Sequence, residues 1–168
     1  MGVAGCGKTS VGQALAPLLQ SRYRDGDELH PTANIAKMSR GAPLTDADRW
    51  PWLTLVGQAL ARDAPLIVGC SALKRRYRDH IRVEAAAPVL FIHLAGSRAV
   101  IEARLQARTG HFMPPALLAS QFAALEPPDP DEAAITVDID QPFAAVIATI
   151  LAKLAMRPET APRPTPIR

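Results

Sequence analysis

The sequence predicts an α/β fold in which a parallel sheet is covered by helices on both faces. Short apolar runs of strand length, such as PLIVGC (65–70) and PVLFIHL (88–94), alternate with longer segments of helical periodicity. A strand that is apolar throughout is typical of a parallel sheet with both faces buried, and strands that alternate with helices indicate right-handed βαβ units. We expect residues 1–156 to form one domain, because 168 residues can bury a single sizeable core.

The other elements follow from local patterns. Thr45, with Asp48 three residues later, is expected to cap a helix over TDADRWPWLTLVGQALARD (45–63), and Ser97 is expected to open another. The remaining strand candidates are RYRD (22–25) and AITVDID (134–140). The remaining helix candidates are residues 9–20, TANIAKMSR (32–40), LKRRYRDHIRVEAA (73–86), SRAVIEARLQAR (97–108), ALLASQFAALE (116–126) and PFAAVIATILAKLAM (142–156).

A glycine loop opens the chain. The stretch MGVAGCGKTS fits G-x-x-x-x-G-K-[ST], the pattern of a P-loop, in which backbone N–H groups surround a phosphate at a helix N-terminus. Lys8 is expected to reach the β- and γ-phosphates, and the Thr9 hydroxyl is expected to hold Mg²⁺. The expected nucleotide-binding residues of the loop are Gly2, Val3, Ala4, Gly5, Cys6, Gly7, Lys8, Thr9 and Ser10.

A buried strand normally precedes such a loop, but only Met1 does so here. The first strand is therefore expected to be missing from this chain. Loss of a central strand would cost many kcal/mol, against a total stability of about 5–15 kcal/mol. Either Met1 is an internal methionine and the strand is encoded upstream, or the chain is a shortened, inactive nucleotide-binding protein. We favour the first explanation.

Longer blocks of sequence are more specific than the loop. The segments DGDELHPTANIAKMSRGAPLTDADRWPWL (25–53), CSALKRRYRD (70–79), RTGHFMPPALLASQFAALEPP (108–128) and VDIDQP (137–142) resemble, in this order, the signature regions of the gluconokinase family. The resemblance extends from Gly2 to about Ala155. It implies a P-loop kinase-like fold with a helical lid at about residues 109–128. It also implies an ATP:D-gluconate 6-phosphotransferase that uses ATP and Mg²⁺ to make 6-phospho-D-gluconate.

Asp25 and Asp27 are the expected acidic residues of the site. They lie two residues apart at the end of a predicted strand, and therefore at the carboxyl edge of the sheet, where open α/β folds bind ligands. By similarity to related kinases, Asp27 would hydrogen-bond the acceptor hydroxyl and act as base, while Asp25 would organise Mg²⁺ through water. The alternative is that both aspartates cap a turn, since Asp-Gly is also turn chemistry.

Gluconate carries a carboxylate and several hydroxyls, so its site requires a cation and polar groups. Arg49 and Lys74 are the first choices for the carboxylate, followed by Arg78, and His30 is expected to contact a hydroxyl. The neighbouring arginines at 76 and 82 are expected to lie on a solvated helix face. Shikimate or a related acid remains an alternative substrate.

Two arginines point towards the lid. Arg104 and Arg108 are four residues apart, and such a pair is mutually repulsive unless an anion lies between them. In similar kinases, lid arginines neutralise charge on the phosphates as the lid closes. Gln121 is expected to assist closure. The segment 138–142 resembles the border of an adenine site, which adds Gln141 and Pro142 to the expected nucleotide contacts.

The remaining expectations concern partners, metal sites, localisation and the C-terminal tail. The net charge of +3 comes from scattered cations without a nucleic-acid motif, so no nucleic-acid partner is expected. No apolar stretch is long enough to span a membrane, no signal peptide is visible, and we expect a cytoplasmic protein. The cysteines and histidines show no zinc-ligand spacing. Residues 157–168, rich in proline, are expected to be a disordered tail, and the resemblance leaves a homodimer open.

Overall fold

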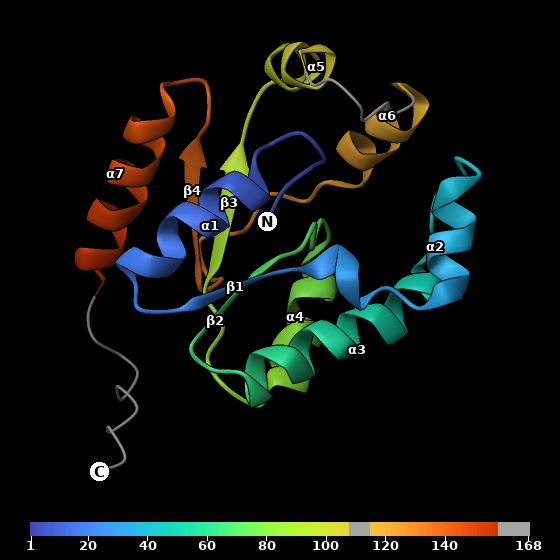
Figure 1. Cartoon of the computed structure of the whole chain (residues 1–168), viewed down its shortest axis with the longest axis horizontal. Helices are drawn as coiled ribbons and strands as arrows, with labels where there is room; N and C mark the ends of the chain where they lie inside the picture. The colour runs from blue at the N-terminus through green and yellow to red at the C-terminus, as the bar shows by residue number, and fades with distance from the viewer. Residues whose placement is uncertain (108–114, 158–168) are drawn as a thin grey trace.

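The computed structural model describes residues 1–107 and 115–157 (Figure 1). Residues 109–114 of the expected lid, Arg108 just before it, and nearly all of the expected tail lie outside the described residues. The elements are, in chain order, α1 (Lys8–Leu18), β1 (Arg22–Asp25), the 3₁₀ helix η1 (Gly26–Leu29), α2 (Thr32–Ser39), α3 (Asp46–Arg62), β2 (Leu66–Gly69), α4 (Arg75–Ala85), β3 (Phe91–Ala95), α5 (Arg98–Gln106), α6 (Pro115–Ala124), β4 (Ala134–Asp138) and α7 (Phe143–Ala155).

The strands of the described residues form two parallel pairs. β1 pairs with β2, with Arg22 opposite Leu66, and β3 pairs with β4, with Phe91 opposite Ala134. The parallel arrangement predicted from the sequence is confirmed, and the division into two pairs is new.

Met1 lies between the two pairs. Its amino group donates to the carbonyl of Ile92, and its own carbonyl accepts from the N–H of Leu94 at 3.0 Å. The next residue, Gly2, donates to the carbonyl of Ser71 at 3.1 Å. A single residue of the sequence therefore sits where the expected first strand would run.

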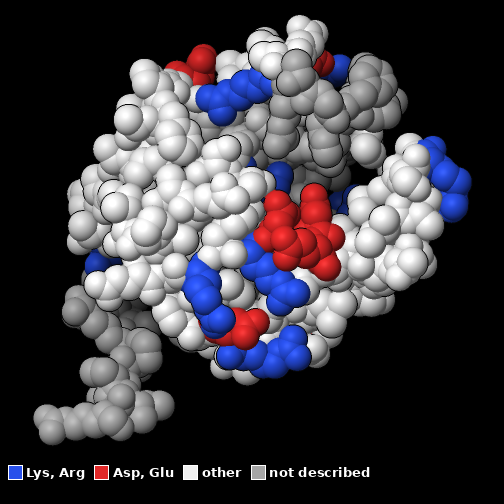
Figure 2. Space-filling view, in the orientation of Figure 1, with Lys and Arg blue, Asp and Glu red and all other residues white. Residues whose placement is uncertain are grey.

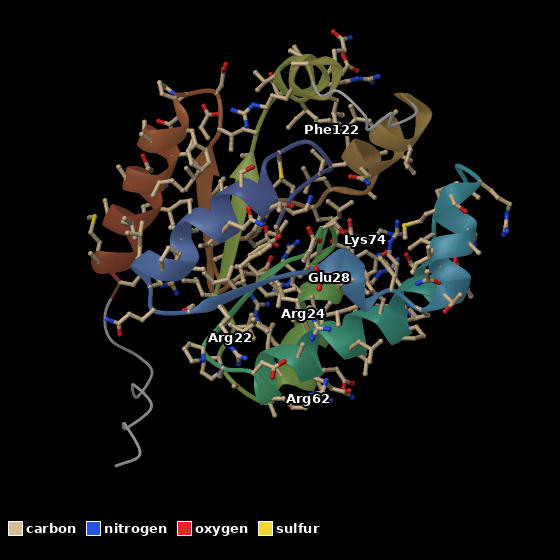
Figure 3. All side chains as sticks on the ribbon, in the orientation of Figure 1. Arg22, Arg24, Glu28, Arg62, Lys74 and Phe122 are labelled. Carbon is tan, nitrogen blue, oxygen red and sulfur yellow. The ribbon has the colours of Figure 1, made fainter. Side chains whose placement is uncertain are left out.

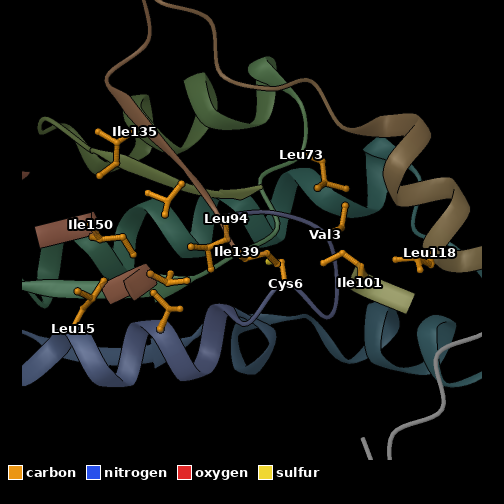
Figure 4. Packing of buried hydrophobic residues seen from close by; sticks show 13 residues of the cluster. Val3, Cys6, Leu15, Leu73, Leu94, Ile101, Leu118, Ile135, Ile139 and Ile150 are labelled. Carbon is orange, nitrogen blue, oxygen red and sulfur yellow. The ribbon is translucent and has the colours of Figure 1, made fainter. Parts of the chain in front are cut away.

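Two apolar clusters place helices on opposite sides of the strands. On one side Leu15 of α1 and Ile150 of α7 pack with Leu94 of β3, as Figure 4 shows. On the other side Trp52 of α3 and Ile81 of α4 belong to a second buried cluster, which includes Phe91 of β3. The prediction that helices cover both faces of the strands is confirmed.

Two predicted helix caps are confirmed. Thr45 and Asp48 form a reciprocal capping box at the start of α3, with the Thr45 N–H donating to Asp48 Oδ2 at 2.6 Å. The Ser97 hydroxyl accepts from the N–H of Val100 at 3.3 Å at the start of α5. None of the helices within the described ranges is both long enough and apolar enough to cross a membrane.

Candidate active site

The phosphate loop, residues 2–9, is shaped by its glycines. Gly5 and Gly7 have φ values of +82° and +94°, which residues other than glycine rarely adopt. A Cβ at Gly5 would also lie 2.8 Å from Cγ of Leu105. Gly7 is the N-cap of α1, so the positive end of an eleven-residue helix begins directly at Lys8. This geometry is suited to an anion.

Lys8 lies over the loop. Its Nζ donates to the carbonyls of Gly2 at 3.1 Å and Val3 at 3.0 Å. The ammonium is therefore held against the loop backbone, and its contact with phosphates stays a prediction. The loop is also anchored from α6, because Gln121 Oε1 accepts from the N–H of Ala4 at 2.7 Å.

Thr9 and Asp25, the two residues expected at the metal, are in contact. The Thr9 hydroxyl donates to Asp25 Oδ2 at 3.1 Å, while Asp25 Oδ1 accepts from the N–H of Asp27 at 3.1 Å. Asp25 thus caps η1 with one oxygen and faces Thr9 with the other. The two side chains fit Mg²⁺ chemistry, since that ion binds few protein oxygens and fills its octahedron with phosphate oxygens and water. No group of three or more His, Cys, Asp or Glu among the described residues could hold a metal by itself.

A cavity of about 470 Å³ brings the catalytic candidates together. We call it the nucleotide cavity. Its floor is the phosphate loop, and Asp25 and Asp27 form one wall. The opposite wall comes from α5, the residue after β4 and the start of α7, and consists of Arg104, Leu105, Ile139, Phe143 and Val146. The predicted residues Lys8, Thr9, Asp27 and Arg104 therefore share one cavity.

Arg104 is fixed across the nucleotide cavity. Its guanidinium donates to the carbonyl of Ile139, and its Nη1 would lie 3.9 Å from a Cβ at Gly7. The guanidinium therefore lies beside the turn of the phosphate loop, which agrees with the expected contact to phosphate. Its expected companion, Arg108, lies outside the described residues.

His30 lies behind Asp27. It is 8% exposed and stacks on Trp52, with 4.1 Å between ring centroids. Burial, assisted by the charge of Arg49, lowers the pKa of His30 to about 4, so the ring is neutral near pH 7. Its Nε2 lies 3.8 Å from Asp27 Oδ1, whereas the Asp27 side chain itself is 84% exposed. The His30 ring therefore lies beside the Asp27 carboxylate and is almost fully covered. Only the small exposed part of the ring could contact a substrate hydroxyl.

Arg49 and Lys74 meet at Tyr77. Their charged groups lie 5.7 and 5.5 Å from the centroid of its ring, and Lys74 Nζ donates to Asp46 Oδ1 at 3.2 Å. The hydrogen bond from the Tyr77 hydroxyl, followed by that from Lys74, lowers the pKa of Asp46. Figure 3 labels Lys74 between η1 and α6 in that view. Both cations that the sequence proposed for a carboxylate therefore lie near the same ring.

Arg78 does not agree with the expected substrate contact. Its side chain is fully buried, and it donates to Glu132 through Nε at 2.7 Å and Nη2 at 2.6 Å. Its remaining terminal nitrogen, Nη1, donates to backbone carbonyls, including that of Glu126 at 2.9 Å. Because these protein acceptors take its donors, we replace the substrate contact with a structural role: Arg78 joins α4 to the segment before β4.

The expectation of a solvated helix face needs correction at Arg82. Arg82 is partly buried, with its guanidinium 4.9 Å from the ring centroid of Phe91 and 3.4 Å from Glu132. Arg76 is exposed, as expected, and pairs with Asp46. The helical periodicity did not reveal that acidic residues from distant segments lie against α4.

Of the predicted adenine border at 138–142, only Ile139 lines the nucleotide cavity, and Gln141 and Pro142 do not. Gln141 Nε2 donates to the carbonyl of Asp138 at 2.6 Å, and Pro142 is the N-cap of α7. The cavity is lined instead by the flanking residues Ile139 and Phe143, and Phe143 is 50% exposed. Sequence reasoning assigned Phe143 to a helix alone. The sequence signal that could have identified Phe143 as a cavity residue was an aromatic side chain in the first helical turn after a proline.

Charge on the molecular surface is mixed. On the face shown in Figure 2, blue lysine and arginine side chains alternate with red acidic ones and do not form one broad patch. Ion pairs account for part of this pattern, including Arg24 with Glu28 at 3.7 Å and with Asp63 at 3.9 Å.

Known proteins resemble the chain over most of its length. The thermosensitive gluconokinase of Escherichia coli is 47% identical over 151 residues, which cover 87% of this chain and 80% of that protein. The chain belongs to the gluconokinase family. The crystal structure of a gluconokinase from Sinorhizobium meliloti has a TM-score of 0.84 at 48% identity and covers 92% of this chain and 89% of that one.

A more distant structure extends the likeness of fold. An APS kinase from Mycobacterium tuberculosis has a TM-score of 0.60 at 18% identity, covering 92% of this chain and 94% of that one. No protein-family profile matches the chain. The P-loop kinase-like fold and the family predicted from the four sequence blocks are therefore confirmed.

Proposed function

We propose that this gluconokinase-family protein transfers the γ-phosphoryl group of ATP to D-gluconate, giving 6-phospho-D-gluconate and ADP. The observation that carries the proposal is the nucleotide cavity, which is lined by both the phosphate loop and Asp27. The names of its relatives favour gluconate over shikimate as the acceptor. The intact loop contacts favour an active enzyme over an inactive binding protein.

The loop residues hold the triphosphate in this scheme. Lys8 exchanges its carbonyl contacts with Gly2 and Val3 for oxygens of the β- and γ-phosphates. Thr9 would hold Mg²⁺ through its hydroxyl, and Asp25 beside it would help to hold the ion through water. A bound Mg²⁺ would supply charge neutralisation between the phosphates. Ile139 and Phe143 border the adenine in place of direct side-chain contacts from Gln141 and Pro142.

Asp27 acts on the acceptor. Its exposed carboxylate accepts the hydrogen bond of the gluconate hydroxyl, orients it in line with the γ-phosphate and takes its proton as transfer proceeds. The neutral ring of His30 behind it prevents movement away from the cavity. Arg104, joined by Arg108 from the lid, neutralises charge on the transferring group.

The carboxylate of gluconate binds at Arg49 and Lys74. Both cations lie near the Tyr77 ring, and the charge of Arg49 also lowers the pKa of His30, which lies beside Asp27. A carboxylate there would share Lys74 with Asp46. We assign no substrate contact to Arg78.

A coupled assay of ADP release tests the activity. Purified protein is given MgATP with gluconate, with shikimate or with no acceptor. We expect ADP release that depends on gluconate and requires Mg²⁺. Release independent of gluconate, or preferred release with shikimate, would reject the assignment. We also propose a cytoplasmic setting, and the homodimer remains a prediction that light scattering can test.

A further inference from the structure

Helix α6 and the two residues that follow it, 115–126, contact both the phosphate loop and the start of α4. We call this segment the strap. Its apolar side is anchored in the core, because Leu118 is buried in the cluster that also contains Val3 of the phosphate loop, as Figure 4 shows. Its polar contacts lead in two directions, one towards the nucleotide cavity and one towards Lys74 at the start of α4.

The first contact of the strap holds the phosphate loop. Gln121 Oε1 accepts from the N–H of Ala4 at 2.7 Å, and Ala4 lines the nucleotide cavity. The next residue, Gly5, has a φ of +82°, and a loop that is rich in glycine can adopt several backbone conformations. A hydrogen bond from outside the loop stabilises one of these conformations. Gln121 supplies such a bond.

The second contact of the strap holds the start of α4. Lys74 is the N-cap of this helix, but its side chain makes no capping hydrogen bond. The N–H of Arg75 donates instead to Glu126 Oε2 at 2.7 Å, so a carboxylate from the strap caps α4. The backbone of Glu126 also donates to the carbonyl of Leu73 at 2.8 Å and accepts from Arg78 Nη1 at 2.9 Å. The residues on either side of Lys74 are therefore both bound to Glu126.

The part of the strap between these two contacts is packed against the core. Phe122, which Figure 3 labels on α6, packs against the same cluster as Leu118. Leu125 packs against both apolar clusters of the molecule. Close packing makes such a segment resist deformation. The strap therefore sets the position of the phosphate loop relative to the start of α4.

We propose that Gln121 and Glu126 are positioning residues for phosphoryl transfer. Gln121 holds the phosphate loop in the conformation that binds the triphosphate, and Glu126 holds Lys74 where it meets the acceptor. Each residue acts through the group that it holds. The acceptor half of this inference rests on the proposed function, whereas the nucleotide half requires only that the phosphate loop binds a nucleotide. Loss of the first contact should weaken nucleotide binding, and loss of the second should weaken acceptor binding.

Steady-state kinetics of two variants separate the two roles. Gln121→Met keeps the length of the side chain but removes the acceptor for Ala4, so we expect KM for MgATP to rise roughly three- to tenfold and KM for gluconate to change by about twofold or less. Glu126→Met removes the cap at Arg75 and should reverse this pattern. Glu126→Gln, which keeps an acceptor for the same N–H, should restore KM for gluconate. Ser120→Ala is the control, because Ser120 is an exposed residue of α6 whose hydroxyl donates to Leu117 within the helix.

Calorimetry and amide hydrogen exchange follow the same contacts without turnover. Binding of a non-hydrolysable ATP analogue with Mg²⁺ should weaken in Gln121→Met and not in Glu126→Met, and exchange at the N–H of Arg75 should become faster only in Glu126→Met. If the unmodified chain released no ADP with gluconate, the proposed function would fail, and these two measurements would still decide the roles of Gln121 and Glu126. Equal effects of both variants on both ligands, or no effect on either, would overturn the proposal.

Discussion

At the scale of single residues, Asp27 is the side chain on which catalysis depends most in this account. It follows β1 within η1, and its exposed carboxylate lines the nucleotide cavity. Asp27→Asn keeps the shape of the side chain but removes the base, so we expect kcat to fall by about 10²–10⁴. Affinity for ATP should change far less, which equilibrium binding of a fluorescent nucleotide would measure.

Glu28→Gln is the matched control for Asp27→Asn. Glu28 is the next residue on η1, is also largely exposed, and pairs with Arg24. We expect its variant to retain the turnover of the unmodified chain. An Asp27→Asn enzyme with the same turnover would identify Asp27 as a turn residue without a catalytic function.

Lys8 carries the positive charge closest to the expected phosphates. Lys8→Ala removes a charge that acts on the transition state, and we expect turnover to fall by about 10²-fold or more while the fold is retained. Lys153→Ala is the control, because Lys153 on α7 contacts the carbonyl of Thr136 outside the nucleotide cavity. Turnover and circular dichroism of both variants would be compared. Retained turnover in Lys8→Ala would mean that the phosphate is bound elsewhere.

At the scale of elements, one buried ion pair joins α4 to the segment before β4. The hydrogen bonds from Arg78, followed by that from the Asp129 N–H, outweigh burial and lower the pKa of Glu132 to about 2. Arg78→Met would leave Glu132 charged and buried, so we expect a loss of about 3–5 kcal/mol in the free energy of unfolding. Urea denaturation would measure it.

Two variants distinguish the ion pair from charge on α4 in general. Arg75→Ala removes an exposed arginine that pairs with Asp129 and Asp131, and we expect little change in stability. The double variant Arg78→Met with Glu132→Leu should be more stable than Arg78→Met alone. If Arg78→Met were as stable as the unmodified chain, the ion pair between Arg78 and Glu132 would not contribute to the free energy of unfolding.

Local signals explain why most elements could be predicted. The capping box at Thr45 and the cap at Ser97 act within one turn of helix, and the run at 65–70 reads as a buried strand without knowledge of its neighbours. The bonds of Arg78 could not be predicted, because Glu132 is 54 residues away and Glu126 is 48. The 3₁₀ helix η1 was also missed, since Asp-Gly signals a turn without specifying its form.

The residues of the site that could be predicted are those that lie within the phosphate-loop motif or within one of the four sequence blocks. The loop, Asp25 and Asp27 lie in such blocks, and the structure places them in one cavity. The convergence of Arg49 and Lys74 on Tyr77 joins the start of α3 to that of α4, and the spacing of residues alone does not encode it. Phe143 enters the cavity through the packing of α7, which a pattern of helical periodicity does not resolve.

At the scale of the whole molecule, buried histidines make stability depend on pH. Burial lowers the pKa of both His30 and His93 to about 4, from an ordinary value of 6.5. Between these values the unfolded chain binds more protons than the folded one, so stability is complete above about pH 6.5 and falls as the pH falls towards 4. Each histidine contributes up to about 3 kcal/mol to this loss.

His93→Gln tests the pH dependence away from the nucleotide cavity. We expect the free energy of unfolding, measured in urea at pH 7.5 and pH 5, to fall less steeply in the variant. The Met1 amino group is present in both proteins, and its charge is one of the causes that lower the pKa of His93. Equal pH dependence in the two proteins would show that His93 does not titrate differently on folding.

The nucleotide cavity is the feature of the whole molecule that the sequence indicated most directly. The phosphate loop, Asp25 and Asp27 all line it, as the loop motif and the block at 25–53 suggested. The division of the strands into two pairs around Met1 required the structure.

The most direct measurement is a crystal structure with a non-hydrolysable ATP analogue, Mg²⁺ and D-gluconate. We predict that the γ-phosphate lies against Lys8 and Thr9, that a gluconate hydroxyl contacts Asp27, and that its carboxylate lies at Arg49 and Lys74. A nucleotide bound away from the loop, or gluconate bound away from Asp27, would contradict the account.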